Sequence, residues 1–216
     1  QRELRFAYQD PQTRSSEQVM GNIYIGLVHY PVLNKFTETV ITSVSNLDIH
    51  DIARSAHTYG VRKYFLITPE TNQQELIKRI TGFWSKNPAI MYNPMRSEAL
   101  EVTHVCSSIE ESINLITTQE KKRPILITTT ARKMPKQVSF GYLRTLSTTA
   151  SPAYILFGTG YGLIDDVHNS ADYILEPIYG RGEYNHLSVR SAVAIVLDRI
   201  LSEDIHGRNN GYSANS

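Results

Sequence analysis

The sequence predicts an α/β fold: a parallel sheet with helices on both of its faces. Short apolar runs of strand length alternate along the chain with longer segments of helical periodicity. Strands that alternate with helices at this spacing form a parallel sheet covered on both faces. The loops richest in glycine each follow one of the apolar runs. In such sheets ligands bind at the carboxyl ends of the strands, so these loops are the candidate functional region.

Length and composition limit the architecture. The chain has 216 residues, 41% of them hydrophobic, which suits one domain with a substantial core. The net charge is only +1, so no global field attracts nucleic acid, and any such site must be a local basic patch. The single cysteine, Cys106, excludes an internal disulfide and cannot carry a zinc ligand set, which favours a reducing cytoplasm. We find no signal peptide and no apolar run near the length of a membrane span.

The chain divides into three regions. Residues 1–21 are polar and lack periodicity, which indicates a linker or tail, whereas residues 22–203 hold the strand and helix alternation. Residues 204–216 are short of apolar side chains, so we expect a disordered tail. The chain begins with Gln1 rather than Met, which suggests a fragment or a processed product. The leading linker hints at an upstream domain, and simple trimming is the alternative.

The first half of the domain begins with a buried strand. The run Asn22–His29 is apolar, whereas Phe36–Asn46 is rich in β-branched residues and fits an extended or a helical segment. Asp48 can cap a helix over Ile49–Tyr59 that stops at Gly60. The apolar stripe of this helix leaves two charged residues off its core face, Asp51 and Arg54.

The remaining elements follow from the same periodicities. Further strands are predicted at Lys63–Thr68, Glu101–Val105, Pro124–Thr128, Tyr154–Phe157 and Tyr173–Leu175. Further helices are predicted at Asn72–Lys86, Ile109–Gln119 with Ser108 as its cap, Ser139–Leu146 and Val189–Leu201.

Three loops in the C-terminal part stand out. Gly158–Gly162 (GTGYG), Glu176–Gly182 (EPIYGRG) and Tyr184–Ser188 (YNHLS) lie between apolar runs within fewer than fifty residues. Glycine-rich loops of this kind let a backbone approach a ligand closely. The first loop differs from the dinucleotide-binding fingerprint, because its third glycine comes one position early. A purely structural turn is the alternative interpretation, and a neutral pocket of this kind does not suit a phosphate.

These loops resemble motifs two and three of the SPOUT RNA methyltransferases. The resemblance rests on GTGYGL, LEPIYG and NHLSVRSAVAIVLDRI and covers about residues 21–203. It is strongest for the branch found beside or fused to tRNA guanine-N1 methyltransferase. It implies a deep C-terminal trefoil knot and S-adenosylmethionine (SAM) held by backbone groups of the loops. The implied cofactor-binding residues are Thr129, Thr130, Phe157, Gly158, Thr159, Gly160, Gly162, Leu175, Glu176, Pro177, Ile178, Asn185, His186, Leu187 and Ser188.

A further segment, Asp48–Val61, resembles SPOUT motif one. Arg54 falls on the arginine of that motif and Asp48 on its asparagine, a departure for which Asn46 could substitute. The resemblance implies that Arg54 and Asp48 are catalytic, because this arginine is implicated in catalysis in ribose 2′-O-methylating relatives. Arginine keeps its proton and is a poor base, so Arg54 would orient a phosphate or stabilise an oxyanion. The alternative is an ordinary charge on a helix surface.

Other polar residues have simpler interpretations. Arg132, Lys133 and Lys136 flank a ligand-side loop and are the candidate contacts for RNA phosphates. His50 and His57 suggest a solvated helix face. Either Asn185 or Ser188 should cap the last helix. His186 has no partner at chelating spacing, so we expect no metal.

Three functions stay open at this stage. The first is SAM-dependent methyl transfer to RNA (tRNA or rRNA, at a ribose or base atom). The second is a non-catalytic SAM-binding or partner module, and the third a flavodoxin-like nucleotide-binding domain. We also expect a homodimer whose sites share residues, because the final helix has an apolar face larger than one sheet edge needs. That face consists of Ala192, Val193, Val196 and Leu197.

Overall fold

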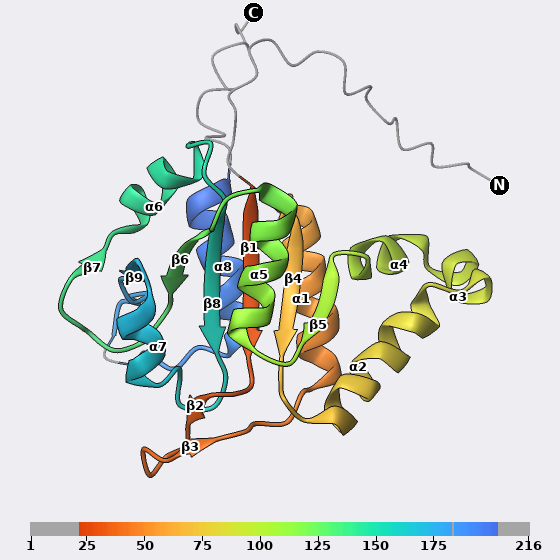
Figure 1. Cartoon of the computed structure of the whole chain (residues 1–216), viewed down its shortest axis with the longest axis horizontal. Coiled ribbons are helices and arrows are strands. Elements are labelled where there is room, and N and C mark those ends of the chain that lie inside the picture. The colour runs from red at the N-terminus through yellow and green to blue at the C-terminus, as the bar shows by residue number, and fades with distance from the viewer. Residues whose placement is uncertain (1–21, 183, 203–216) are drawn as a thin grey trace, which may run out of the picture.

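The computed structural model describes residues 22–182 and 184–202, and its centre is a parallel sheet of seven strands (Figure 1). The strand order is β5-β4-β1-β8-β6-β9-β7. The strands are β1 (Ile23–Val28), β4 (Lys63–Ile67), β5 (Thr103–Cys106), β6 (Ile125–Thr128), β7 (Gln137–Val138), β8 (Ala153–Gly158) and β9 (Tyr173–Leu175). A separate antiparallel pair is formed by β2 (Val32–Leu33) and β3 (Thr39–Val40). The predicted fold class is therefore confirmed, whereas the two predicted tails lie outside the described residues.

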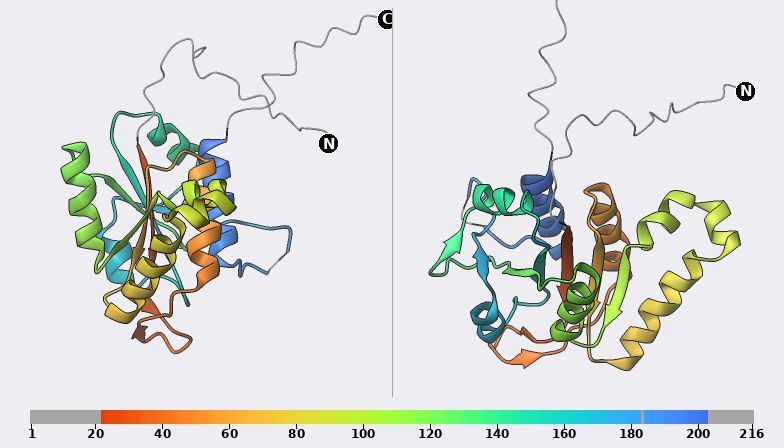
Figure 2. Two further views of the ribbon diagram at one scale, coloured as in Figure 1. Left: turned by 90° about the vertical axis from the view of Figure 1, so that its right-hand side faces the viewer. Right: turned by 45° about the horizontal axis from the view of Figure 1, so that its top comes forward.

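Helices cover both faces of the sheet (Figure 2). One face carries α1 (Asn46–Thr58) and α8 (Val189–Leu201), and the other carries α5 (Ile109–Glu120) and α7 (Asp165–Ser170). Beyond these, α6 (Phe140–Ser147) packs on α8, and α2 (Thr71–Trp84), α3 (Asn87–Tyr92) and α4 (Pro94–Leu100) lie at the β5 edge. Within the described residues no helix is both long enough and apolar enough to span a bilayer.

The continuous apolar runs are explained by a core on each side of the sheet. In β1, Ile23, Ile25 and Leu27 belong to the cluster that contains the α1 and α8 side chains. Tyr24 and Val28 point the other way and belong to the cluster under α5. Because successive side chains of a strand face opposite sides, a strand covered by helices on both faces must be apolar at every position.

Two buried tyrosines connect the sheet to α5. Tyr154 is fully buried and donates a hydrogen bond to Ser112 Oγ at 2.8 Å. The hydroxyl of Tyr24 donates to the carboxylate of Glu120 at the end of the same helix. A tyrosine buried in this way needs a partner for its hydroxyl, so these bonds help to fix the position of α5 on the sheet.

The start of α1 differs from the prediction. Ser45, not Asp48, is the N-cap: its backbone is extended and its hydroxyl accepts a hydrogen bond from the Asp48 amide at 3.1 Å. The ambiguous stretch 36–46 contains β3 and an extended segment that leads into the cap. Asp48 therefore lies in the first turn, and its carboxylate is free to bind another group.

Sequence patterns missed α3, α4, α7 and the two-residue β7. The segment 87–100 holds Pro88 and Pro94, yet each proline lies in the first turn of its helix, where the missing amide costs nothing. Since α4 continues to Leu100, β5 begins at Thr103, two residues after the predicted start. The predicted Ser108 cap is confirmed, because its hydroxyl accepts from the Glu111 amide at 3.0 Å.

The path of the C-terminal part is the path that a trefoil knot requires. Strand β9 lies between β6 and β7, which are consecutive in sequence, so the connection 129–136 crosses it. Arg132 in that connection pairs with Asp165 of α7, on the α7 side of the sheet. The chain leaving β9 runs to α8 on the opposite side (Figure 2). Such threading is a rare exception to the rule that connections do not pass through one another.

Candidate active site

Four loops meet at the edge of the sheet where β1, β6, β8 and β9 end, at the bottom of the sheet in Figure 1. Side-chain hydroxyls attach two of these loops to neighbouring strands. Thr159 Oγ1 donates to the Val28 carbonyl at 2.9 Å, and Thr129 Oγ1 donates to the Leu156 carbonyl at 2.9 Å. The loops therefore have fixed positions relative to the sheet, as a site formed by backbone groups requires.

The GTGYG turn needs its first two glycines for packing. A Cβ on Gly158 would lie 2.6 Å from the Leu163 amide nitrogen, and one on Gly160 would lie 2.9 Å from the Leu33 carbonyl. Gly160 also has a positive φ of 59°, which other residues adopt only with strain. Gly162 has a φ of 101° and open space around its α-carbon. The turn is held against β2, since the Tyr161 amide donates to the Leu33 carbonyl at 2.9 Å.

The loop after β9 is anchored to α6. The Glu176 amide donates to the Val138 carbonyl at 2.9 Å, and its carboxylate accepts from the Phe140 amide at 3.0 Å, at the start of α6. Pro177 is buried, and the Ile178 amide has no hydrogen-bond acceptor in the described part of the chain. The Glu176 side chain thus holds the loop, while Ile178 leaves a donor available to a ligand.

The third loop connects to the loop after β6. Asn185 Nδ2 donates to the Ala131 carbonyl at 3.0 Å. Ser188 is the N-cap of α8 and accepts from the Ser191 amide at 3.3 Å, which settles the choice between the two candidate caps. The edge of the His186 ring contacts Tyr184, with 5.5 Å between ring centroids.

The structure thus brings the predicted cofactor loops to one edge of the sheet. The predicted residues differ, however, in which of their groups can reach a ligand. Phe157 and Leu175 are 2% and 0% exposed, so only their backbone groups can reach a ligand. Thr130 Oγ1 accepts from the Arg132 amide at 3.1 Å and stabilises the turn of its own loop. Leu187 is 46% exposed and lies beside the N-terminus of α8.

A buried polar group under the first loop was not predicted. His29, at the end of β1, is fully buried, and its Nδ1 lies 3.1 Å from Thr42 Oγ1. Thr42 in turn contacts Thr159 Oγ1 at 2.5 Å. Burial lowers the pKa of His29 to about 4, so the imidazole is neutral at pH 7. The only sequence signal was a histidine at the end of an apolar run.

The two motif-one residues face different surroundings. Arg54 is exposed, whereas Asp48 is 7% exposed and its Oδ1 lies 2.7 Å from Arg190 Nη1 of α8. The two side chains are six residues apart and leave the helix about 120° apart. Arg190 Nε also lies 3.6 Å from Asp51. Sequence reasoning missed Arg190, although a charge in the first turn of a largely apolar helix is a signal for such a pair.

The predicted RNA contacts keep their exposed positions, but one of them has an acidic partner. Arg132 Nη2 lies 3.2 Å from Asp165 Oδ1. Lys133 and Lys136 are exposed in the same connection, and Lys136 has a φ of 58°. Their role in RNA binding stays a prediction.

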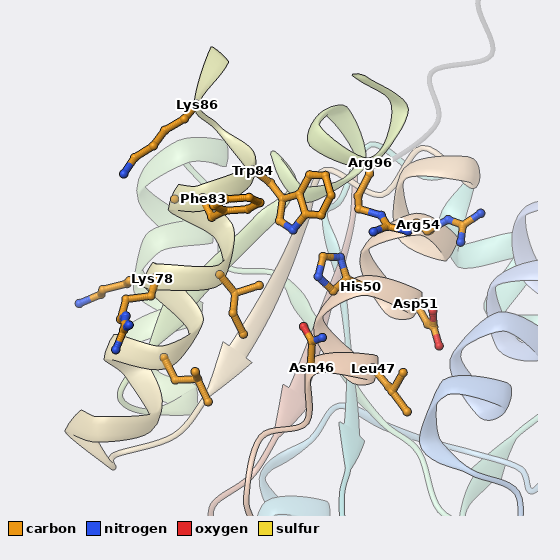
Figure 3. Close-up of a pocket in the computed structure, with 14 residues that line it drawn as sticks. Asn46, Leu47, His50, Asp51, Arg54, Lys78, Phe83, Trp84, Lys86 and Arg96 are labelled. Carbon is orange, nitrogen blue, oxygen red and sulfur yellow. The ribbon is translucent and has the colours of Figure 1, made fainter. Parts of the chain in front are cut away.

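A groove of about 920 Å³ opens between α1, α2 and α4 (Figure 3). Arg54 lines it together with His50 and Trp84, whose rings lie edge to face at a centroid distance of 5.8 Å. The prediction that His50 belongs to a solvated face was wrong, because its ring packs against Trp84 of α2 and its Nδ1 is buried. His57 is exposed as predicted, 3.3 Å from Glu98.

The apolar face expected to form a dimer is used inside the chain. Val193, Val196 and Leu197 are 0–2% exposed and belong to the core beneath α1 and α8. The reason given for a dimer was therefore wrong, because α1, α6 and β8 cover that face. The homodimer itself stays a prediction.

Fold and loops together define an α/β protein with a parallel sheet and a candidate site at the strand ends. A family model described as SAM-dependent RNA methyltransferase matches residues 22–202. This is most of the chain, and the chain therefore belongs to that family.

Two relatives and one solved structure illustrate the likeness. The chain is 40% identical over 184 residues to an uncharacterized protein of Aquifex aeolicus, covering 85% of this chain and 90% of that one. It is 41% identical over 182 residues to a tRNA (guanine-N(1)-)-methyltransferase of Oleidesulfovibrio alaskensis, covering 84% of this chain but only 42% of that relative. The SpoU methyltransferase AviRb of Streptomyces viridochromogenes, solved with AdoMet, has a TM-score of 0.53 at 14% identity and covers 89% and 60% of the two chains. At that identity the likeness shows the fold.

The residues at the strand ends fit the cofactor of this family. A sulfonium carries a positive charge, and adenine needs apolar walls with a few hydrogen bonds. The loops supply exposed apolar side chains, among them Leu187 and Tyr161, and the unpaired Ile178 amide. Gly162 has no neighbour within 4 Å of a would-be Cβ, which leaves room for close approach.

Proposed function

We propose that loops 158–162, 176–182 and 184–188 bind SAM and that Arg54 acts on an RNA acceptor, in tRNA or rRNA. The observation that carries the proposal is that these loops, separate in sequence, end together at one edge of the sheet and are fixed there by hydrogen bonds. Those bonds include Thr159 to Val28, Glu176 to Phe140 and Asn185 to Ala131. A preorganised backbone surface of this kind holds a cofactor with little reorganisation.

The proposed chemistry depends on positioning. Bound SAM supplies an electrophilic methyl group, and transfer requires the acceptor lone pair in line with the S–CH3 bond, so much of the rate comes from orientation. Arg54 is exposed and has no carboxylate partner among the described residues, so its guanidinium is available to a phosphate or a developing oxyanion. Asp48 is bound to Arg190 and would act by holding α1 against α8.

Calorimetry with S-adenosylhomocysteine tests the cofactor site. We expect the wild-type chain to bind and Gly160→Val to lose binding, because a side chain there strains a positive φ and meets the Leu33 carbonyl. Gly141→Val is the matched control, since Gly141 is exposed and its Cβ would meet only Ser139 Oγ at 3.8 Å. Thermal melts of both variants separate loss of binding from loss of folding. Absence of binding by the wild type, or equal binding by Gly160→Val, would remove the proposal.

The second candidate is a module that binds SAM and assists another methyltransferase. It is favoured by the relatives named tRNA (guanine-N(1)-)-methyltransferase, of whose length the chain spans 42% in two cases. In such proteins this domain would be joined to a further domain, and tRNA would be the substrate class. Methyl transfer by the chain alone distinguishes this candidate from the first.

We also propose that the protein forms a homodimer and that it is cytoplasmic. The support for a dimer moves from α8 to exposed apolar residues near the site: Leu47 is 57% exposed, Tyr184 78% and Leu187 46%. Exposed apolar residues that gather into a patch are typical of a surface that is covered in an assembly. Light scattering that shows a stable monomer at micromolar concentration would contradict the dimer.

A further inference from the structure

The groove between α1, α2 and α4 has a strongly basic lining. Its charged residues are five cations, Arg54, Lys78, Arg79, Lys86 and Arg96, and one carboxylate, Asp51. The whole chain carries a net charge of only +1, so this is a concentration of positive charge and not a general property of the surface. Because the net charge is so small, any nucleic-acid site must be a local basic patch, and this groove is such a patch.

The cations of the groove lack acidic partners. Within residues 22–182 and 184–202, Arg54, Arg79, Lys86 and Arg96 form no ion pair, and Asp51 is engaged by Arg190. Arg54 comes from α1 and Arg96 from α4. Burial lowers the pKa of His50, and the nearby charges of Arg96 and Arg54 lower it further. In Figure 3 Arg96 lies beside the Trp84 ring, and Arg54 lies next to it at the α1 side of the groove. Like charges gathered from separate helices without a counterion are typical of a site for a polyanion.

Aromatic rings lie beside these cations. The Arg96 guanidinium lies 4.8 Å from the centroid of the Trp84 ring, and the edge of Phe83 contacts that ring at 5.5 Å between centroids. Phe83 is 58% exposed at the groove, so much of its ring is open to a ligand. Cations interleaved with exposed aromatic rings are typical of surfaces that bind single-stranded nucleic acid, where phosphates meet the cations and bases stack on the rings.

We propose that this groove binds a single-stranded segment of the RNA substrate, with phosphates on Arg54, Arg79, Lys86 and Arg96 and a base stacked on Phe83. The proposal rests on the proposed function, since the same Arg54 that lines the groove is assigned to the acceptor. It extends that function by placing the RNA entry along α2 and α4, away from the connection that holds Arg132. A duplex offers phosphates but no free base face, so Phe83 is what selects a single strand.

Fluorescence anisotropy with a fluorescein-labelled 12-nucleotide single strand of mixed sequence, and with a hairpin of the same length, tests this site. Phe83→Ala should weaken binding of the single strand about tenfold, the scale of losing one base stack. Phe83→Tyr keeps a ring and should bind like the wild type. The matched control is Tyr92→Ala on α3, because Tyr92 is 84% exposed but does not line the groove. It should leave affinity unchanged.

Salt dependence tests the cations. Replacing Arg79 and Lys86 by Gln should weaken binding and lower the slope of log affinity against log salt by about 1.4, which is two phosphate contacts on a single strand. Lys121→Asn with Lys122→Gln removes two exposed charges after α5, on the other face of the sheet, and should leave the slope unchanged. Asn is chosen because Lys121 has a left-handed φ of 56°.

Three results would overturn the site: no binding of the single strand by the wild type, unchanged binding by the groove variants, or equal binding of the hairpin with no effect of Phe83→Ala. Calorimetry with S-adenosylhomocysteine on the same variants separates the two proposals. If the groove variants bind RNA normally and the cofactor still binds, the proposed RNA groove is contradicted and the proposed cofactor site is not. If RNA binding depends on the groove residues but the cofactor does not bind, the proposed methyltransferase function is contradicted, and the groove still stands as an RNA-binding site.

Discussion

His29 shows how burial sets the protonation of one residue beside the cofactor loops. Its imidazole is fully buried, with Nδ1 near Thr42 Oγ1 and Nε2 without a partner among the described residues. Burial lowers its pKa to about 4, although the nearby Asp48 carboxylate and the bond to Thr42 oppose the shift. The folded state therefore holds a neutral His29 over a pH range in which the unfolded chain protonates it.

The first prediction concerns the stability that follows from His29. Because the folded pKa is lower than the unfolded value of 6.5, its contribution is fully present above pH 6.5 and is lost as pH falls toward 4. The loss over this window should be about 3 kcal/mol. His29→Gln removes the titration and should flatten the dependence of unfolding free energy on pH. Urea titrations at pH 7 and pH 4.5 measure both chains, and parallel pH dependences would contradict the account.

At the same scale, some site residues were predictable and others were not. Gly158, Gly160 and Gly162 were found because loops rich in glycine leave a local signal in the sequence. The need for glycine at position 160 could not be predicted, because the Leu33 carbonyl that leaves no room for a Cβ there belongs to a segment far away in the chain. Arg190 was missed for the same reason, since its partner Asp48 comes from another helix.

At the scale of elements, α1 and α8 are joined near both ends. Arg190 binds Asp48 at 2.7 Å near their N-termini, and the Tyr59 hydroxyl donates to Asp198 at 2.9 Å near their C-termini. Between these contacts the two helices share an apolar core. This arrangement fixes α1, and with it Arg54, relative to the loop that ends at Ser188.

The prediction for these helices is a coupling between Asp48 and Arg190. Arg190→Met leaves the Asp48 carboxylate nearly buried and unpaired, and should lower the unfolding free energy by about 2 kcal/mol. Adding Asp48→Asn removes the orphaned charge and should restore part of that loss. Urea unfolding of the two single variants and the double variant gives the coupling energy. Simple additivity of the two effects would show that the pair contributes nothing.

Elements were predictable where periodicity was local and strong. The runs that became β1, β4, β6, β8 and β9 were all found, as were α5 and α8. The helices α3 and α4 were not predicted, because the prolines in their first turns resemble the prolines that end helices. The groove could not be predicted at all, since Trp84, His50 and Arg96 come from three helices that meet only in the folded chain.

At the scale of the whole molecule, the strand order follows from rules that the sequence obeys. Strands alternating with helices gave the parallel sheet, while the crossing of β9 by the β6–β7 connection was expected only from the resemblance. No local pattern encodes which of two connections passes through the other. The fold places Arg54 and the basic groove on the same side of the sheet as α8, where the loop ending at Ser188 also lies.

The central claim is that this chain transfers a methyl group from SAM to RNA with Arg54 at the acceptor. Tritiated SAM incubated with in vitro transcribed tRNA and rRNA, followed by nucleoside mass spectrometry, tests it most directly. The wild type should label one nucleoside. Arg54→Ala should lower the rate by roughly 10²-fold, the scale of losing one electrostatic stabiliser, while affinity for S-adenosylhomocysteine stays within a few-fold. Full activity of Arg54→Ala would contradict the role of Arg54, and absence of label from every RNA, with the cofactor bound, would contradict the claim itself.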